Sequence, residues 1–246
     1  MVHSVAVVGA TGRMGQLATR LIEVSDDFVL HARIGSRDPL EGIAGADIVL
    51  DLTLPAVSPD VVAAAVERGI PTVVGTSGWT AERLARLRTQ LGEEPQTGVI
   101  VVPNFSLGSV IATRLAAIAA PWFDSIEIIE AHHAGKPDSP SGTAIRTAEL
   151  MAEARGDRGP VAAPHADQRA RGQQVGSIPV HSLRMDGVLA EQQVIFGGHG
   201  ETLRVSHQTV SNASYESGIL LALGAAPATR GLIVGLDALL GIDGDA

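Results

Sequence analysis

Cysteine is absent from this sequence of 246 residues, which excludes disulfide bonds, thiolate metal sites and a cysteine nucleophile. Aromatic residues are scarce at 3%, whereas glycine occurs 28 times, and this combination favours an α/β protein with many tight turns. Basic residues are outnumbered, and the net charge of −9 argues against nonspecific binding to nucleic acid or to an anionic membrane. No apolar run reaches the roughly 18 residues of a membrane span; "GILLALGAAP" ends at Pro227 and predicts a core helix.

The overall composition is that of an ordinary soluble protein. A hydrophobic fraction of 45% and a charged fraction of 18% are typical of globular proteins, and this length can build one large domain or two modest ones. The sequence enters a strand-like run, "SVAVVG", almost at once, so no signal peptide is expected and we predict a cytoplasmic protein.

Three glycines stand at the end of this first strand-like run. Gly9, Gly12 and Gly15 form a G-x-x-G-x-x-G variant of the dinucleotide-binding fingerprint, and an amphipathic helical pattern follows them. The first glycine permits a tight turn, the second lets the backbone approach a pyrophosphate, and the third allows the helix to pack closely on the strand. Because glycine turns between strands and helices are common, the motif by itself only favours a nucleotide site.

Strand-like and helix-like segments alternate through the first hundred residues. Short β-branched runs predict strands at 28–34, 47–53, 71–76 and 98–104. Amphipathic patterns predict helices at 58–69 and 80–92. This alternation predicts a Rossmann-type parallel sheet with right-handed crossovers, in which ligands bind beyond the carboxyl ends of the strands.

The end of the second strand bears on the choice of cofactor. NAD-specific folds usually place a carboxylate there, about 20 residues past the glycines, to hold the ribose 2′-hydroxyl. Here the strand ends in Gly35, Ser36 and Arg37, and no carboxylate comes before Asp38. Ser36 and Arg37 could bind a 2′-phosphate, which favours NADPH over NADH; the alternative is a solvent-exposed turn in which Arg37 binds nothing.

The stretch "IEAHHAGKPDSPSGTA", residues 129–144, contains Lys136, the only lysine among 18 lysine and arginine residues. One explanation is a chance remnant of an arginine-rich composition. The other is chemical, because a partly buried lysine can give up a proton, whereas an arginine stays protonated at any working pH. His132 and His133 would point to opposite faces of a strand, so they cannot easily chelate one ion, and we expect no metal site.

The same stretch runs into a predicted helix at 141–154. Ser141, Gly142 and Thr143 lie at its N-terminal end, where free amides favour a carboxylate. Two imidazoles, one ammonium and a helix N-terminus in one loop suit a dianionic substrate that needs a proton donor. A capped helix after a polar loop is the purely structural alternative.

The 15 residues "EAHHAGKPDSPSGTA" resemble the signature of the dihydrodipicolinate reductase family, usually E-x-H-H-x-x-K-x-D-x-P-S-G-T-A. Other segments also fall where that family has its own, so the resemblance spans nearly the whole chain; they are "VVGATGRMG", "DLTLP", "GTSGW", "PNFSLG" and "GLIVGLDALLGI". The resemblance implies NAD(P)H-dependent reduction of 4-hydroxy-tetrahydrodipicolinate, a cyclic dicarboxylate, to tetrahydrodipicolinate in lysine and diaminopimelate biosynthesis.

The resemblance also implies roles for individual residues. His132 would be the catalytic proton donor or acceptor, and Lys136 would be a second proton donor. His133 and the segment 141–143 would bind a substrate carboxylate. The residues that would line the cofactor, with Ser36 and Arg37, are Gly9, Ala10, Thr11, Gly12, Arg13, Met14, Gly75, Thr76, Ser77, Val102, Pro103, Asn104 and Phe105.

Two departures from the family pattern are visible. The family commonly has an arginine after a serine before its last long helix, and Asn212 stands at that place here. The family's acidic residue after the second strand is also absent, which again disfavours NAD.

The sequence predicts two domains. Residues 1–105 would form the nucleotide-binding domain and 106–212 an α+β substrate domain with an open mixed sheet. Residues 213–246 would form a segment that returns through a helix at 213–226 and packs back on the first domain. The polar, Gly/Pro-rich stretch 155–179 predicts a long mobile loop. The alternating pattern at 180–198 leaves an apolar sheet face exposed, which favours a face-to-face oligomer; the resemblance implies a homotetramer.

Two other functions are compatible with a nucleotide-binding first domain. One is a different nicotinamide-dependent amino-acid or semialdehyde dehydrogenase, although the lack of cysteine excludes a thiohemiacetal mechanism. The other is a nucleotide-sensing regulator without catalysis, which would have no use for a His-His-x-x-Lys loop.

Overall fold

The structure, a computed structural model, describes residues 1–242 and divides into two compact units. The first unit contains residues 1–107 and the chain from Tyr215 onward, and the second contains Gly108–Ser214. The domain boundaries proposed from the sequence lie after residues 105 and 212. Residues 243–246 of the proposed C-terminal segment lie outside the described part of the chain.

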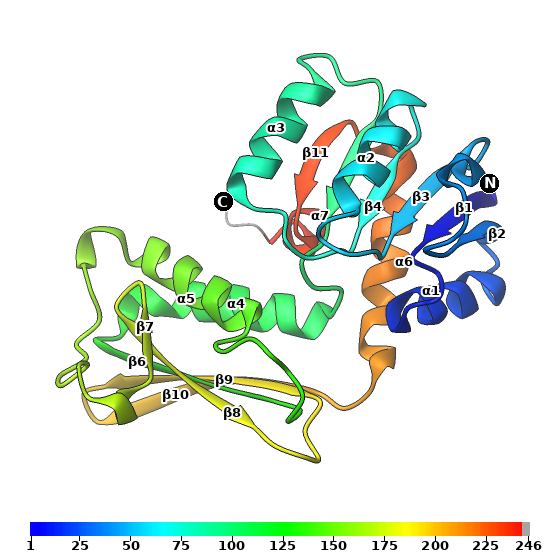
Figure 1. Ribbon diagram of the computed structural model, residues 1–246. Coiled ribbons are helices and arrows are strands. Elements are labelled where there is room, and N and C mark those ends of the chain that lie inside the picture. Colours follow the sequence, from blue (N-terminus) through cyan, green and yellow to red (C-terminus); the bar gives the residue numbers. More distant parts are fainter. Residues whose placement is uncertain (243–246) are drawn as a thin grey trace. The chain divides into compact units, whose positions relative to one another are not determined.

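Six parallel strands form the sheet of the first unit, in the order β11-β5-β4-β3-β1-β2 (Figure 1). Their bounds are β1 His3–Val8, β2 Phe28–Ile34, β3 Ile48–Asp51, β4 Thr72–Val74, β5 Gly98–Val101 and β11 Gly231–Val234. Strands β3, β4 and β5 are buried throughout, which explains their continuous apolar sequence. The chain leaves β1 for β2 on one side and then for β3 on the other, so the topological switch point lies between β1 and β3.

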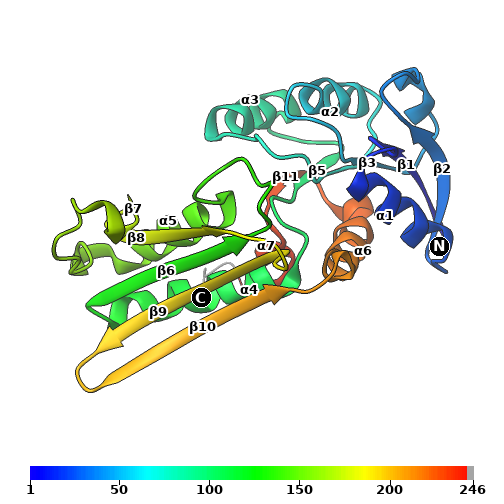
Figure 2. The ribbon, with the colours of Figure 1, turned by 60° about the horizontal axis from the view of Figure 1, so that its bottom comes forward.

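Helices cover both faces of this sheet, with α2 and α3 on one and α1 and α6 on the other (Figure 2). Their bounds are α1 Arg13–Glu23, α2 Ser58–Glu67, α3 Ala81–Leu91 and α6 Glu216–Ala225, followed by the short α7 Leu236–Leu240. Helix α1 buries Gly15, Ala18 and Ile22, three and four residues apart, and contacts β1 and β2 with that face. The predicted Rossmann-type parallel sheet is therefore confirmed.

The return of the chain to the first unit differs from the expected single helix at 213–226. Residues Asn212–Tyr215 form a 3₁₀ turn, and α6 begins only at Glu216. After α6 the chain adds β11, which pairs in parallel with β5 at the edge of the sheet. This strand is not among the elements predicted from the sequence.

The second unit is built on a mixed sheet of five strands in the order β10-β9-β6-β8-β7. Their bounds are β6 Ser125–His132, β7 Gln173–Val175, β8 Ile178–Arg184, β9 Ala190–Gly198 and β10 Glu201–Thr209. Strands β6 and β8 run parallel, and the remaining pairs are antiparallel. The mixed sheet predicted for this part of the chain is confirmed.

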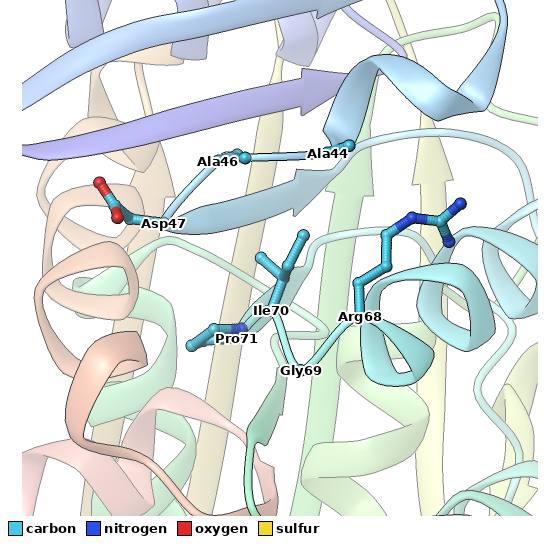
Figure 3. Close-up of a pocket in the computed structure, with 8 residues that line it drawn as sticks. Ala44, Ala46, Asp47, Arg68, Gly69, Ile70 and Pro71 are labelled. Atoms are coloured by element: carbon cyan, nitrogen blue, oxygen red, sulfur yellow. The ribbon is translucent and has the colours of Figure 1, made fainter.

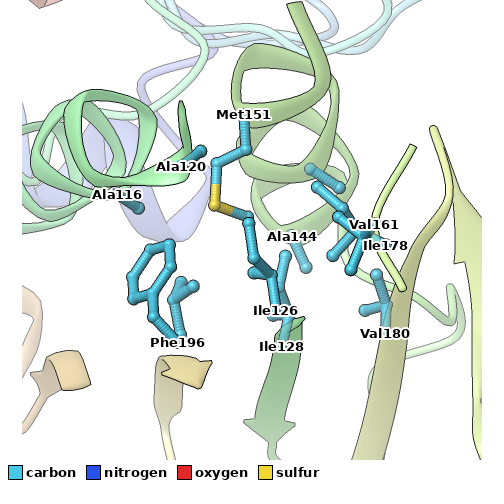
Figure 4. Close-up of a cluster of buried hydrophobic side chains, with 12 residues drawn as sticks. Ala116, Ala120, Ile126, Ile128, Ala144, Met151, Val161, Ile178, Val180 and Phe196 are labelled. Carbon is cyan, nitrogen blue, oxygen red and sulfur yellow. The ribbon is translucent and has the colours of Figure 1, made fainter. Parts of the chain in front are cut away.

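Two helices, α4 Leu107–Ala119 and α5 Gly142–Arg155, cover one face of this sheet. Between them and the strands lies a buried apolar cluster, shown in Figure 4, that includes Ile126, Ile128, Met151, Val180 and Phe196. Because side chains alternate along a strand, even-numbered residues of β6 face the helices and odd-numbered ones face away. This alternation decides which side of the sheet each polar residue of β6 occupies.

The prediction of a long loop over 155–179 is wrong in part. Two 3₁₀ turns, Gly156–Arg158 and Arg169–Arg171, lie within it, and β7 pairs with the start of β8. Gly176 and Ser177 join β7 to β8 with φ of +56° and +71°, the two positive φ angles of a type I′ hairpin turn. A two-residue turn of this kind holds the strands in register, which explains why a polar stretch still adds a strand.

Candidate active site

The glycine turn after β1 has the shape that a dinucleotide phosphate requires. Gly9 has φ +85°, and a Cβ there would collide with the carbonyl oxygen of Leu52, just after β3. A Cβ on Gly15 would collide with the backbone of Gly9, so α1 can start this close to β1 only without a side chain. Gly12 forms the N-cap of α1, and within the described chain no side chain caps this end. Its free amides therefore fit a cofactor phosphate.

The predicted cofactor residues after β4 and β5 lie at the same edge of the sheet. A Cβ on Gly75 would collide with the ring of Phe105, so the loop after β5 packs directly on bare backbone. Val102 and Phe105 are buried in the core, whereas Ser77 and Pro103 are exposed. Backbone groups, rather than the two apolar side chains, are what this edge offers to a cofactor.

A buried carboxylate that is not among the predicted site residues organises these loops. Asp51, the last residue of β3, accepts hydrogen bonds from the amide and hydroxyl of Thr53 at 3.0 and 2.6 Å. It also accepts from the hydroxyls of Thr76, at 3.2 Å, and Ser58. The side chain of Thr76 thus ties the loop after β4 to the end of β3.

The turn after β2 is exposed, with Ser36 and Arg37 at its tip. The carboxylate of Asp38 accepts a hydrogen bond from the amide of Gly35 at 2.8 Å and so closes the turn. The first carboxylate after the strand is therefore used within the turn, while a hydroxyl and a guanidinium stand beside it.

His132 ends β6 and lies against a buried carboxylate. Its Nδ1 is 2.6 Å from Oε2 of Glu130, two residues earlier on the same face of the strand. The Glu130 side chain is fully buried, and that of His132 is 16% exposed. With Nδ1 engaged, the outer nitrogen of the ring is Nε2.

Arg184, the last residue of β8, grips the same carboxylate with two hydrogen bonds of 2.9 Å, one to each oxygen. It also donates to the carbonyl oxygen of Asp138 at 2.5 Å. The family motif contains Glu130, but the sequence analysis gave it no role, and it missed Arg184 entirely because the pairing depends on the register of β6 and β8.

Lys136 lies on the loop that leaves β6. Its amide donates to the carbonyl oxygen of His133 at 3.0 Å, which forms a turn, and its Nζ is 2.7 Å from Oδ1 of Asp138. The Lys136 side chain is 21% exposed. Since Arg184 binds both Glu130 and Asp138, the structure brings the two predicted proton donors, His132 and Lys136, into one connected group.

The start of α5 closes this group. Ser141 is the N-cap, and its hydroxyl accepts from the amide of Ala144 at 3.2 Å while its own amide donates to Glu130 at 3.2 Å. The amides of Gly142 and Thr143 come next, in the first turn, where a helix leaves amides without intrahelical partners. Gly142 is exposed, so a carboxylate can approach this end.

The remaining sequence predictions concern His133, a metal site and a membrane span. His133 follows the end of β6 and is exposed. Among the described residues no group of three or more His, Cys, Asp or Glu could hold a metal ion, and no helix is long and apolar enough to cross a membrane.

Burial and charge shift the pKa values of this group. Burial lowers the pKa of His132, the positive charges of Lys136 and Arg184 lower it further, and Glu130 opposes them. Burial alone would raise the pKa of Glu130, but hydrogen bonds from Arg184 and His132 outweigh it and the pKa falls. The site therefore holds an ionised carboxylate beside a histidine that favours its neutral form.

A separate surface pocket of about 470 Å³ lies at the opposite end of the first sheet (Figure 3). Residues 44–47 and 68–71, at the amino ends of β3 and β4, line it. Ligands of parallel α/β sheets bind at the carboxyl ends of the strands, so we do not assign this pocket to the reaction.

A Rossmann-type unit with an uncapped glycine turn, in one chain with a His/Lys loop at a helix N-terminus, defines a nicotinamide-dependent oxidoreductase. Family models agree: that for "Dihydrodipicolinate reductase, N-terminus" matches residues 3–105, and that for "Dihydrodipicolinate reductase, C-terminus" matches 108–240. The chain belongs to the dihydrodipicolinate reductase family, and the predicted resemblance is confirmed.

Individual relatives support the same assignment. The chain is 59% identical over 244 residues to a 4-hydroxy-tetrahydrodipicolinate reductase of Clavibacter michiganensis, covering 99% of this chain and 88% of that protein. It is 46% identical over 245 residues to the reductase of that name from Streptomyces coelicolor, with 97% and 98% covered.

Solved structures show the same fold. A dipicolinate-bound dihydrodipicolinate reductase from Paenisporosarcina sp. TG-14 superposes with a TM-score of 0.83 at 29% identity, covering 97% of this chain and 99% of that one. A gentamicin-biosynthesis protein in complex with NAD, GenD2, reaches 0.64 at 13% identity over 98% of this chain and 91% of its own, which shows the shared fold alone.

Proposed function

We propose that this chain reduces 4-hydroxy-tetrahydrodipicolinate to tetrahydrodipicolinate with a reduced nicotinamide cofactor, in lysine and diaminopimelate biosynthesis. The observation that carries the proposal is the cluster of His132, Lys136 and the α5 N-terminus around Glu130 and Arg184. It stands in a chain whose family models and relatives are reductases of this name.

Each part of the cluster has a task in this reaction. After loss of water the ring carries a C=C bond conjugated to a C=N bond, and reduction needs a hydride at one carbon and a proton on a neighbouring atom. The nicotinamide cofactor supplies the hydride when bound. His132, through Nε2, and Lys136, through Nζ, deliver and exchange protons, since both are groups that can act as positioned general acids or bases.

The amides of Gly142 and Thr143 bind one substrate carboxylate. Unpaired N–H groups and the positive end of the α5 dipole favour an anion there. The Ser141 hydroxyl accepts the Ala144 amide as an N-cap, so it supports the helix end, and its own proton remains available to the substrate. His133 is exposed just after β6 and binds the same substrate at the edge of the site.

For the cofactor we propose a preference for NADPH over NADH. The support is the β2 turn, where Asp38 is engaged with the Gly35 amide and Arg37 is the charged group at the tip. A guanidinium makes charge-assisted hydrogen bonds to a phosphate, and a ribose hydroxyl offers it no charge.

We further propose a homotetramer in the cytoplasm. The support lies in the sheet face away from α4 and α5, where Ile129, Leu183 and Ile195 alternate with the core residues, and Leu183 is 48% exposed. An open sheet with apolar side chains on its outer face is typical of a face-to-face assembly. Light scattering of the purified protein tests the mass, and cell fractionation tests the location.

A coupled assay tests the activity. Pyruvate and aspartate semialdehyde are converted by the preceding synthase, and the loss of NADPH or NADH is then followed with and without this protein. We expect oxidation of the cofactor that requires all components. A nucleotide-sensing regulator would bind the cofactor without oxidising it, and another dehydrogenase would oxidise it only with a different substrate.

A further inference from the structure

Strand β6 carries two glutamates that look alike and face opposite sides of the sheet. Glu127 lies 2.7 Å from Nε2 of His181 and accepts a 2.6 Å hydrogen bond from Arg171. Glu130 lies 2.6 Å from Nδ1 of His132 and accepts from Arg184. Each carboxylate thus joins one histidine to one arginine, but their surroundings differ.

Burial separates the two. The Glu127 side chain is 29% exposed, whereas that of Glu130 is fully buried, and Ser141 adds an amide hydrogen bond to Glu130. A buried charge is tolerated only when it is paired and hydrogen-bonded, and Glu130 has hydrogen bonds from a guanidinium, an imidazole and an amide. Such a carboxylate is fixed in place on both oxygens.

The fixed carboxylate decides how the imidazole of His132 is protonated. An ionised carboxylate only accepts hydrogen bonds, so the ring must present N–H to it at Nδ1. The position of the hydrogen bond at one ring nitrogen sets the tautomer, which leaves the lone pair of the neutral ring on Nε2. The opposite tautomer would set two acceptors against each other at 2.6 Å.

We propose that Glu130, held by Arg184, is a positioning residue for His132: it keeps the imidazole proton on Nδ1 and makes Nε2 the nitrogen that exchanges a proton with the substrate. This inference rests on the proposed function of His132. The role of Arg184 is to hold the carboxylate ionised and oriented, while its hydrogen bond to the carbonyl oxygen of Asp138 ties the Lys136 loop to the same point.

The charges around His132 predict how its pKa changes when Glu130 is removed. Glu130 stabilises the imidazolium, whereas burial and the positive charges of Lys136 and Arg184 oppose it. Without the carboxylate, His132 loses its proton at a lower pH. The inflection that His132 contributes to the pH profile of kcat/KM then moves to lower pH, and a purely structural role for Glu130 would not move it.

The test compares Glu130→Gln with the matched variant Glu127→Gln, which removes the same charge from the same strand on the other face. Steady-state kinetics of the full chain with NADPH should show kcat about 10-fold lower or more for Glu130→Gln, on the scale of general acid–base catalysis. KM for NADPH should stay within about twofold, and Glu127→Gln should keep kcat within about twofold at equal oligomeric state. Glu130→Asp, which restores the charge, should recover part of kcat.

Nitrogen NMR supplies a readout without turnover. In protein with ¹⁵N-labelled histidine, the His132 signals are those that vanish in His132→Gln. We expect the neutral ring of the wild type to carry its proton on Nδ1, and Glu130→Gln to give a mixture of tautomers. This measurement on the wild type stands even if Glu130→Gln does not fold.

The outcomes separate the two claims. If His132→Gln is slow but Glu130→Gln keeps wild-type kcat, pH inflection and tautomer, the positioning inference is overturned alone. A neutral His132 with its proton on Nε2 in the wild type also overturns it. If His132→Gln keeps the wild-type kcat, the proposed function of His132 itself is overturned.

Discussion

Replacing Arg184 with methionine should destabilise the protein strongly, because it leaves the buried Glu130 carboxylate without its positively charged partner. The guanidinium supplies both 2.9 Å hydrogen bonds to a carboxylate that is fully buried, and the Arg184 side chain is itself only 18% exposed. Removing one partner of a buried ion pair costs about 3–5 kcal/mol, since the other charge is left in the interior without compensation.

A matched variant calibrates this number. Arg171→Met removes the partner of Glu127, where both side chains are about 30% exposed, and pairs open to solvent contribute about 0–1 kcal/mol. With a urea m-value near 3 kcal/mol/M, Arg184→Met should lower the unfolding midpoint by more than about 1 M, and Arg171→Met by less than about 0.4 M.

The assay is urea unfolding followed by far-UV circular dichroism at pH 7 and fixed protein concentration. Adding Glu130→Gln to Arg184→Met should restore part of the loss, because the stranded charge is then gone. An Arg184→Met midpoint equal to that of Arg171→Met would refute the view that Glu130 is a buried charge that depends on its partner.

Acid titration, cofactor binding and inhibition by a dicarboxylate each offer a further test. The pKa of Glu130 lies below its ordinary value of 4.5 and that of His132 below 6.5, so the unfolded chain binds more protons in acid. The free energy of unfolding should therefore fall as pH drops below about 6.5 and again below about 4.5. Burial also lowers the pKa of His207, so His132→Gln should reduce the first step in pH-dependent urea titrations without abolishing it. Arg37→Ala should raise the Kd of NADPH about 10-fold and leave that of NADH unchanged in fluorescence titrations, and equal losses would exclude a phosphate contact. Pyridine-2,6-dicarboxylate should inhibit competitively against substrate and raise Tm, because a ligand at 100 times its Kd stabilises the folded protein by about 2.7 kcal/mol. The absence of any Tm shift at saturating cofactor would count against the Gly142 and Thr143 amides as a carboxylate site.

Local signals made the first unit predictable. Strands β1 to β5 are short, rich in β-branched residues and followed by loops of small or polar residues. Gly9 and Gly15 occupy places where a side chain would collide with backbone. The positive φ of Gly9 and the close contact between Gly15 and Gly9 are local constraints, so the sequence displays them directly. The loop from His132 to Thr143 was equally visible, because its unusual residues are contiguous.

Features that depend on distant pairing were missed. Arg184 contacts Glu130 only because β8 pairs with β6 in the register that places Ser182 beside Glu130. The sequence around either residue does not indicate that register. Strand β11 could be predicted only by knowing that one edge of β5 is open for pairing. The β7–β8 hairpin is different, since Gly176-Ser177 between β-branched residues is a recognised two-residue turn signal that the polar composition around it obscured.

Steady-state kinetics of Lys136→Arg distinguish a proton donor from a simple positive charge at this position. Arginine keeps the charge and can still pair with Asp138, which lies 2.7 Å from the lysine Nζ, so substrate binding through charge should survive. A guanidinium does not release its proton at working pH. We therefore predict that kcat falls about 10²-fold or more while KM changes much less, as expected when an interaction of the transition state is lost. A kcat near that of the wild type would contradict the claim and leave Lys136 as a carboxylate clamp.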